Sequence, residues 1–155
     1  MPTSTQPGAK NKILVVDDDR MVLAALTELL CDDYDVIPAS SGAEAVELAR
    51  QQPDIATVVM DIKMADVDGI TAARRIREFL PDLPVIFHTG YPGDYDEDTL
   101  DEHEKPFDYI QKGDAISRLT RSVRNAVEAY RFRTDRKALA DFAEANYGLV
   151  GRSEP

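Results

Sequence analysis

The chain has 155 residues, 43% of them apolar, so it can bury one good core, and its length favours one domain with a short remainder over a two-domain enzyme. Its net charge of −11 argues against a nucleic-acid-binding surface, which needs a clustered basic face. The late basic residues, from Arg118 to Lys137, lie at helical spacing among apolar positions. This pattern indicates a solvated helix face or a protein contact.

The first ten residues contain prolines, a glycine and hydroxyl residues but no apolar core of a signal peptide, and they are expected to form a flexible lead. No apolar run approaches the roughly 18 residues of a membrane span, so we expect a soluble, cytoplasmic protein without a membrane partner. Cys31 is the single cysteine, which excludes an internal disulfide. Its position in an apolar helical stretch predicts a packed thiol.

Short apolar runs alternate with helical patterns along the chain. Strands are predicted at Lys12–Val16, Asp35–Ala39, Ile55–Met60, Val85–Thr89 and 109–111, and helices at Arg20–Leu30, Gly42–Gln51, 70–79, 96–103 and from residue 115 onward. The helix at 96–103 is the weakest, because residues 94–104 contain seven acids and only Leu100 as a large aliphatic. Five strands alternating with five helices, joined by right-handed crossovers, predict an α/β doubly wound parallel sheet with its site at the strand C-termini.

The last predicted helix is longer than one compact domain requires. Its apolar positions step by three and four, and the stripe continues after a charged stretch: Ile116, Leu119, Val123, Ala126 and Tyr130, then Ala138, Phe142 and Ala145. We therefore expect a domain over residues 11–130 and a helical extension or linker over 131–155. Packing on a partner helix in a homodimer is the favoured explanation for the extension, and a frayed tail is the alternative. A homodimer could also form through the face shared by the predicted fourth helix, fifth strand and fifth helix.

Polar residues follow four of the predicted strands. Asp17 and Asp18 follow the first, Asp61 the third and Lys112 the fifth, while Thr89 ends the fourth. Clustered carboxylates raise one another's pKa and suit a hard cation such as Mg²⁺. A carboxylate can also attack phosphorus to form an acyl phosphate, whose oxygens an ammonium and a hydroxyl would stabilise. The pattern favours phosphoryl chemistry on a carboxylate.

These residues, in this order, resemble the receiver domain of two-component response regulators, over about residues 11 to 130. The resemblance implies a flavodoxin-like sheet of order 2-1-3-4-5, phosphorylation by a sensor histidine kinase or phosphotransfer protein, and no enzymatic activity beyond self-phosphorylation from phosphodonors and slow autodephosphorylation. It implies Asp61 as phosphoacceptor and a Mg²⁺ site. The implied roles of the remaining residues are direct metal ligand (Asp18), ligand through water (Asp17), backbone carbonyl ligand (Lys63), phosphoryl contacts (Thr89 and Lys112) and switch aromatic (Tyr109).

The sequence departs from the family pattern in three places. Lys105-Pro106 copies the family's Lys-Pro, but it precedes the fifth strand, so Lys112, followed by Gly113, is preferred for the lysine role. Met64-Ala65 stands where Met-Pro is usual, and Lys63 places a cation beside Asp61. The last two departures concern the lifetime of the phosphoryl group.

Other polar residues have simpler explanations. Asp19 is expected to favour a helix N-terminus, Ser40 or Ser41 to cap the second helix, and Asp66 and Asp68 to serve as turn and cap residues. His88 and His103 are not accompanied by other residues at the spacing of a metal site, so they are expected to be structural or solvated. Tyr91, two residues past Thr89, could shape water access or simply pack.

Two other functions were weighed. Asp17-Asp18-Asp19 also fits the Asp-x-Asp signature of haloacid-dehalogenase-like phosphohydrolases, with Asp17 as nucleophile and Asp19 as acid, but no substrate cap is present and Asp61 and Thr89 stay unexplained. A pseudo-receiver is disfavoured by the intact set of residues. Residues 147–155 resemble the opening of the AAA+ domain in sigma54-dependent activators, so the chain is expected to act through protein contacts or to be the N-terminal part of such a regulator, without direct nucleic-acid binding.

Overall fold

The computed structural model describes residues 9–90 and 105–147. The predicted helix at 96–103, His103 and Tyr91 lie outside these residues. The described elements, in chain order, are β1 (Lys12–Val16), α1 (Arg20–Leu30), β2 (Asp35–Ala39), α2 (Gly42–Gln51), β3 (Ile55–Met60), α3 (Gly69–Phe79), β4 (Val85–Thr89), β5 (Asp108–Gln111) and α4 (Ile116–Tyr147).

The five strands form one parallel sheet in the order β2-β1-β3-β4-β5, as the resemblance implied. β1, β3 and β4 lie inside the sheet, and their apolar residues are buried almost throughout. A strand buried on both faces needs apolar residues at every position, because neither face meets water. This requirement explains the continuous apolar runs from which the strands were predicted.

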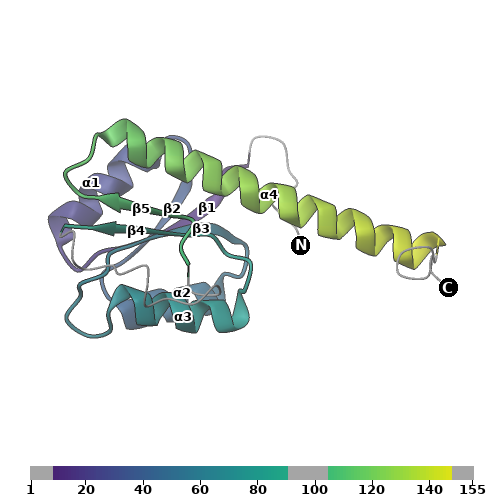
Figure 1. Ribbon diagram of the computed structural model, residues 1–155, viewed down its shortest axis with the longest axis horizontal. Coiled ribbons are helices and arrows are strands. Elements are labelled where there is room, and N and C mark those ends of the chain that lie inside the picture. Colours follow the sequence, from purple (N-terminus) through teal and green to yellow (C-terminus); the bar gives the residue numbers. More distant parts are fainter. Residues whose placement is uncertain (1–8, 91–104, 148–155) are drawn as a thin grey trace.

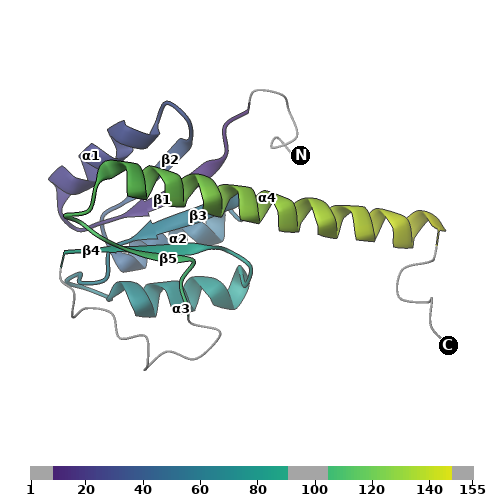
Figure 2. The ribbon, with the colours of Figure 1, turned by 45° about the horizontal axis from the view of Figure 1, so that its top comes forward.

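Helices cover both faces of the sheet, with α1 and the first half of α4 on one face and α2 and α3 on the other (Figures 1 and 2). Each face has its own apolar cluster. Leu14, Met60 and Phe87 pack toward α2 and α3, whereas Ile13, Val59 and Ile86 pack toward α1 and α4. Because successive side chains of a strand point to opposite faces, this alternation fixes the direction of the residues that follow each strand.

Three helices begin at polar caps. The side chains of Asp19, Ser41 and Asp68 accept hydrogen bonds from backbone N–H groups in the first turns of α1, α2 and α3, which confirms the expected caps. Asp66 accepts from the N–H groups of Gly42 and Ala43 at the start of α2. These hydrogen bonds lower the pKa of Asp66 and tie the loop after β3 to a second helix.

The last helix, α4, runs without a break from Ile116 to Tyr147 and extends past the domain (Figure 1), as predicted. Leu119, Val123 and Ala126 are buried under the sheet. Ile116, which the predicted stripe included, is instead 65% exposed at the first position of α4, three residues before the first buried residue, Leu119. On the extension, Phe142 is exposed, as are Phe132 and Leu139, which were not part of that stripe.

The expectation of a packed Cys31 thiol was wrong. Cys31 is exposed at the C-terminus of α1, where its backbone N–H bonds to the carbonyl of Thr27. Leu26 and Leu30 carry the buried face of α1, and the next residue is turned about 100° around the helix axis, away from the sheet. Among the described residues, no helix is long and apolar enough to cross a membrane.

Candidate functional site

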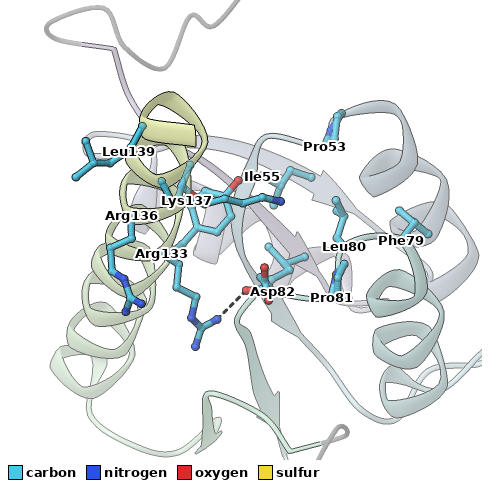
Figure 3. Close-up of a pocket in the computed structure, with 15 residues that line it drawn as sticks. Pro53, Ile55, Phe79, Leu80, Pro81, Asp82, Arg133, Arg136, Lys137 and Leu139 are labelled. Carbon is cyan, nitrogen blue, oxygen red and sulfur yellow. Dashed lines mark hydrogen bonds between the residues drawn. The ribbon is translucent and has the colours of Figure 1, made fainter. Parts of the chain in front are cut away.

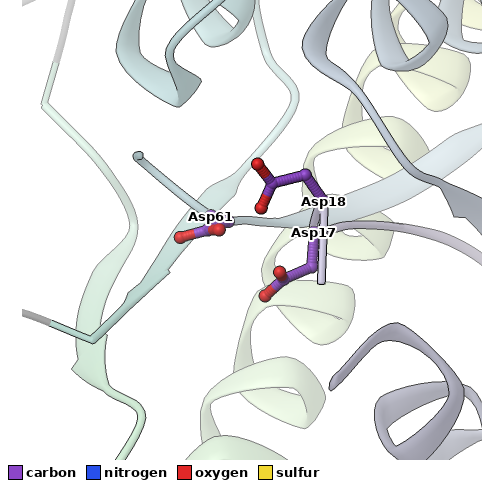
Figure 4. A group of neighbouring side chains, drawn as sticks. All are labelled: Asp17, Asp18 and Asp61. Carbon is purple, nitrogen blue, oxygen red and sulfur yellow. The ribbon is translucent and has the colours of Figure 1, made fainter. Parts of the chain in front are cut away.

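Three carboxylates meet at the C-terminal edge of the sheet. β1 and β3 are neighbours with Val16 opposite Met60, so Asp17 and Asp61, the next residue of each strand, come side by side, and Asp18 follows (Figure 4). One carboxylate oxygen from each residue lies within 4.8 Å of the others. The structure therefore brings together the three acids that the sequence predicted for this edge.

The three acids differ in exposure. Asp17 and Asp61 are 1% and 5% exposed, whereas Asp18 is exposed. Oδ1 of Asp17 accepts a hydrogen bond of 2.9 Å from the N–H of Asp19. Burial, together with the charge of Asp17, raises the pKa of Asp61 to about 6. The negative charge of Asp61 is therefore disfavoured by burial and by the neighbouring charge of Asp17. A cation bound among these carboxylates would reduce both effects.

Lys112, the residue directly after β5, places its ammonium beside the buried acids. Its Nζ lies 2.8 Å from Oδ2 of Asp17 and 3.5 Å from Oδ2 of Asp61. Burial alone would lower the pKa of the Lys112 ammonium, but its hydrogen bonds with the two carboxylates and their charges raise it. The backbone N–H of Lys112 bonds to the carbonyl of Thr89 at 2.7 Å, which fixes the end of β5 against β4.

The structure separates the two competing lysines as the sequence predicted. The carbonyl of Lys105 accepts a hydrogen bond from Arg77, and Phe107 bonds to the carbonyl of Val85 at the start of β4. Lys105 therefore lies near the N-terminal edge of the sheet, away from Asp61. The ammonium beside the acids is that of Lys112.

Thr89 and Tyr109 lie on neighbouring strands and on the same face. Tyr109 pairs with Phe87, and Thr89, two residues further along β4, points to the same side. Thr89 is buried at the end of its strand, and Tyr109 is half-buried against the α2 and α3 side of the core. A hydroxyl residue and an aromatic are thus adjacent, at the edge that carries Asp61.

Lys63, two residues past Asp61, is exposed. It lines, with Asp18, Met64 and Asp68, a cavity of about 520 Å³. This cavity lies beside Asp18, along the loop between β3 and α3. Its lining includes Lys63, whose backbone carbonyl the sequence analysis assigned to the metal.

The sequence profile described as "response regulator receiver domain" matches residues 13–124 of the chain. The chain belongs to this family. The receiver domain is 34% identical, over 139 residues, to the C4-dicarboxylate transport transcriptional regulatory protein DctD of Rhizobium meliloti (strain 1021), covering 88% of this chain and 30% of that protein. It is 33% identical over 144 residues to the transcriptional regulatory protein ZraR of Escherichia coli (strain K12), covering 91% of this chain and 31% of that protein. The chain therefore spans about a third of these regulators.

Solved structures agree with this assignment. A response regulator receiver domain from Clostridium thermocellum superimposes with a TM-score of 0.71 at 31% sequence identity, covering 79% of this chain and 98% of that one. The phosphohydrolase alternative is not supported. The carboxylate of Asp19, its expected acid, caps α1 by accepting from the N–H groups of Met21 and Val22.

Sequence reasoning did not connect His88 with the site of this receiver domain. His88 follows Phe87 on β4 and so faces the α1 and α4 side; continuing the β3–β4 register by one residue places it beside Asp61. It is 7% exposed, and no partner among the described residues bonds to its Nδ1. Burial, then the charge of Lys112, lowers its pKa to about 4. The alternation along β4 could have revealed this placement.

Sequence reasoning also missed the role of Gly69. A Cβ at this position would lie 2.0 Å from the carbonyl oxygen of Asp61 and 2.9 Å from Cα of Ile62. The N–H of Gly69 bonds to the carbonyl of Ile62 at 2.7 Å. The missing side chain lets the start of α3 pack directly on the backbone of the acidic residue, and no periodicity in the sequence signals such an approach.

Proposed function

We propose that Asp61 is the phosphoacceptor of this receiver domain. The observation that carries the proposal is the position of Asp61, which is buried at the end of β3, beside Asp17 and with its Oδ2 3.5 Å from the Lys112 ammonium. In the reaction, a carboxylate oxygen of Asp61 attacks the phosphorus of a phosphohistidine on a sensor histidine kinase or phosphotransfer protein. The P–N bond breaks, the imidazole leaves with the bonding electrons and takes up a proton, and an acyl phosphate remains.

The donor set of the site fits Mg²⁺, because three carboxylates supply hard oxygen ligands and one of them, Asp18, is open to solvent. Asp18 and Asp61 would hold the ion directly, Asp17 through water, and Lys63 through its backbone carbonyl. When bound, the ion supplies positive charge that offsets the oxygens of the transferring phosphoryl group. Lys112 would contribute a further positive charge, 3.5 Å from Oδ2 of Asp61, and Thr89 would contribute a hydroxyl donor.

Phosphorylation is proposed to act through Thr89 and Tyr109. An interaction of the phosphoryl oxygens with the Thr89 hydroxyl favours an inward position of Tyr109, since the two residues are adjacent on one face. The surface proposed to respond is formed by β5 and the start of α4. A change in this surface alters protein contacts, and we expect no enzymatic activity beyond self-phosphorylation and slow hydrolysis of the acyl phosphate.

The wider assembly is also part of the proposal. We expect a receiver unit over residues 11–130 and a linker over 131–155, in a regulator of the kind represented by DctD and ZraR, with the linker leading to a sigma54-type AAA+ module. The extension of α4 is proposed to join two chains in a homodimer. The charge of −11 disfavours direct contact of this chain with nucleic acid.

Intact-mass analysis after incubation with a small acyl phosphate and Mg²⁺ tests the phosphoacceptor. The unmodified chain should gain the mass of one phosphoryl group, and removal of Mg²⁺ with a chelator should prevent the gain. Asp61→Asn should not be phosphorylated, whereas Asp66→Asn, a matched change in the adjacent loop, should react normally. Phosphorylation of Asp61→Asn at the normal rate would falsify the assignment.

A further inference from the structure

A groove of about 830 Å³ lies at the edge of the sheet opposite Asp61, between the end of α3 and the extension of α4 (Figure 3). Its domain side is apolar and includes Ile55 at the start of β3, Leu80 just after α3, and Leu83. Its α4 side combines Tyr130 and two alanines with cationic side chains. The groove therefore has one apolar wall and one wall that carries positive charge.

The charge of the groove is opposite to that of the chain. Its lining contains the cations Arg133, Arg136 and Lys137 and a single acid, Asp82, whereas the whole chain has a net charge of −11. Within residues 9–90 and 105–147, none of these three cations forms an ion pair with an acid. The groove thus carries positive charge that is not paired with any acid of the described residues.

Two of the cations are placed to hold one anion. Arg133 and Lys137 are one turn apart on the same side of α4, and Lys137 extends across the groove toward Ile55 (Figure 3). Arg133 donates to the backbone carbonyl of Asp82 at 3.0 Å, which fixes the guanidinium at the groove and leaves its other N–H groups available. Like charges one turn apart destabilise a helix, so an anion bound between them would remove a repulsion.

The outer side of the extension does not compete for this site. The guanidinium carbon of Arg136 lies 5.8 Å from the centre of the Phe132 ring, and its side chain points away from the groove (Figure 3). Phe132 and Phe142, each five residues from Lys137, are exposed and lie about 140° from it around the helix. A protein contact made through this outer side would therefore leave the groove accessible.

The size and lining of the groove favour a small ligand. Small-molecule sites have volumes of roughly 300–1,000 Å³, a mostly apolar lining and a few polar groups that orient the ligand. A stable protein interface instead covers roughly 800 Å² on each partner, more than the walls of a groove of this volume provide. The apolar wall suits an aliphatic or aromatic body, whereas Arg133 and Lys137 suit a carboxylate or phosphate group.

We propose that this groove binds an amphiphilic anion, with its apolar body against the domain wall and its carboxylate or phosphate group between Arg133 and Lys137. The inference goes beyond the proposed function, because the groove lies at the edge of the sheet opposite Asp61. The ligand would contact both the domain and the extension of α4, and so would add contacts between them.

Calorimetric titration of the 155-residue chain with decanoate, below its micelle-forming concentration, tests the proposal. Decanoate should saturate one site per chain with a dissociation constant of roughly tens to hundreds of micromolar. Octanoate should bind roughly ten-fold more weakly, because it lacks two CH₂ groups. Decanol lacks the charge and inorganic phosphate lacks the apolar body, so each should bind at least roughly ten-fold more weakly than decanoate.

Decyl phosphate, titrated in parallel, compares the two head groups. Tighter binding of decanoate would identify a carboxylate site, and tighter binding of decyl phosphate a phosphate site; either result supports the proposal. If neither amphiphile binds saturably, or if decanol binds as tightly as decanoate, the inference is wrong.

Two charge-neutralising changes locate the head group. Arg133→Gln and Lys137→Gln should each weaken decanoate binding about three- to ten-fold. Arg131→Gln is the matched control, because it removes the same charge from an exposed position of the same helix that does not line the groove. Its affinity should stay within about two-fold of the unmodified chain, since salt screens distant surface charges. Equal weakening in all three variants would indicate a general attraction of the anion to the helix and would overturn the site.

Two alanine replacements locate the apolar body. Ala140→Trp fills the groove and should weaken decanoate binding at least roughly ten-fold. Ala145→Trp places the same side chain at an exposed position outside the groove and should leave the affinity unchanged. Circular dichroism and the unfolding midpoint of each variant verify that the fold is kept. Undiminished binding by a folded Ala140→Trp chain contradicts the proposal.

Methyl NMR of the unmodified chain gives an independent readout of the position of the ligand. Addition of decanoate should shift the methyl signals of Leu80 and Leu83, which line the groove. The signals of Leu26, in the apolar cluster on the other face of the sheet, should not move. Shifts at Leu26 without shifts at Leu80 and Leu83 would place the ligand elsewhere and refute the inference.

Discussion

The ammonium of Lys112 lies 2.8 Å from the carboxylate of Asp17, although β3 and β4 separate their two strands. The side chain reaches across the C-terminal edge of the sheet, and Asp61 lies within 3.5 Å of the same nitrogen. Lys112 therefore brings one positive charge into contact with two buried carboxylates, and its attraction opposes the effect of burial on the pKa of Asp61.

Replacement of Lys112 by Met keeps the length of the side chain but removes this charge. We expect the free energy of unfolding without Mg²⁺ to fall by about 1–3 kcal/mol, since buried carboxylates lose their partner. Mg²⁺ should bind the variant more tightly, as the ion no longer competes with an ammonium, whereas phosphorylation should be slower by at least roughly ten-fold. Urea unfolding, calorimetric titration with Mg²⁺ and intact-mass kinetics measure these effects.

Lys105→Met is the control for the lost charge, because Lys105 lies at the other end of β5. Its unfolding free energy and its phosphorylation rate should stay close to those of the unmodified chain. Equal slowing of phosphorylation in both variants would contradict the assignment of Lys112 to the site.

Much of this site could be predicted from the sequence. Asp17, Asp61, Thr89 and Lys112 follow or end strands whose apolar runs mark them as buried, and in a parallel sheet the C-terminal ends of the strands share one edge. The bounds of β1, β2, β3 and β4 were predicted without error for the same reason. The order of the strands required the family resemblance, because alternation of strands and helices allows several orders.

What the sequence did not reveal depends on tertiary contacts. The predicted stripe of α4 gave no sign that Ile116 is exposed, and the apolar residues around Cys31 in the sequence did not mean that its thiol is buried. The contact between Gly69 and the backbone of Asp61 joins residues from two different elements. Such contacts depend on how a loop closes, and neither composition nor periodicity records them.

Gly69→Ala should disturb Asp61 without changing any charge. The added Cβ would lie 2.0 Å from the carbonyl oxygen of Asp61, so the backbone of the phosphoacceptor or the start of α3 must move. We expect a loss of about 2–4 kcal/mol in unfolding free energy and slower phosphorylation. Gly113→Ala is the matched change, since nothing lies within 4 Å of the added carbon, and it should have less than about 1 kcal/mol of effect.

The unfolding free energy of the metal-free protein should depend on pH through the titration of Asp61. Its pKa of about 6 lies above the ordinary value of 3.8 for a solvated aspartate, so between these values the folded state binds more protons than the unfolded state. Stability from this group is therefore lost as pH rises from about 4 to about 6, on the order of 1–3 kcal/mol. Asp61→Asn lacks the titration, and its advantage over the unmodified chain should grow across this range in urea unfolding with chelator present. A constant difference between the two chains would contradict the raised pKa.

The titration of His88 should change the unfolding free energy in the opposite direction over nearly the same pH range. Its pKa of about 4 lies below the ordinary value of 6.5 for a solvated histidine, so the unfolded state binds more protons between these values. The contribution of His88 to stability is present above about 6.5 and is lost as pH falls toward 4, by up to about 3 kcal/mol. The contributions of Asp61 and His88 to the pH dependence offset each other in the unmodified chain, and variants of each residue alone are needed to separate them.

His88→Leu removes the titrating imidazole together with Nδ1, which has no hydrogen-bond partner among the described residues. The unfolding free energy of the variant, compared with that of the unmodified chain, should be more favourable at pH 5 than at pH 7.5. At pH 5 the unmodified chain must release the proton of the unfolded imidazole in order to bury His88, and the variant has no such cost. His103→Gln leaves His88 as the one histidine of the chain, so its imidazole proton resonances can be followed alone by NMR. A midpoint near 6.5 in that titration would show that His88 is solvated and that its placement beside Asp61 is wrong, whereas a midpoint near 4 supports a neutral imidazole next to the phosphoacceptor at physiological pH.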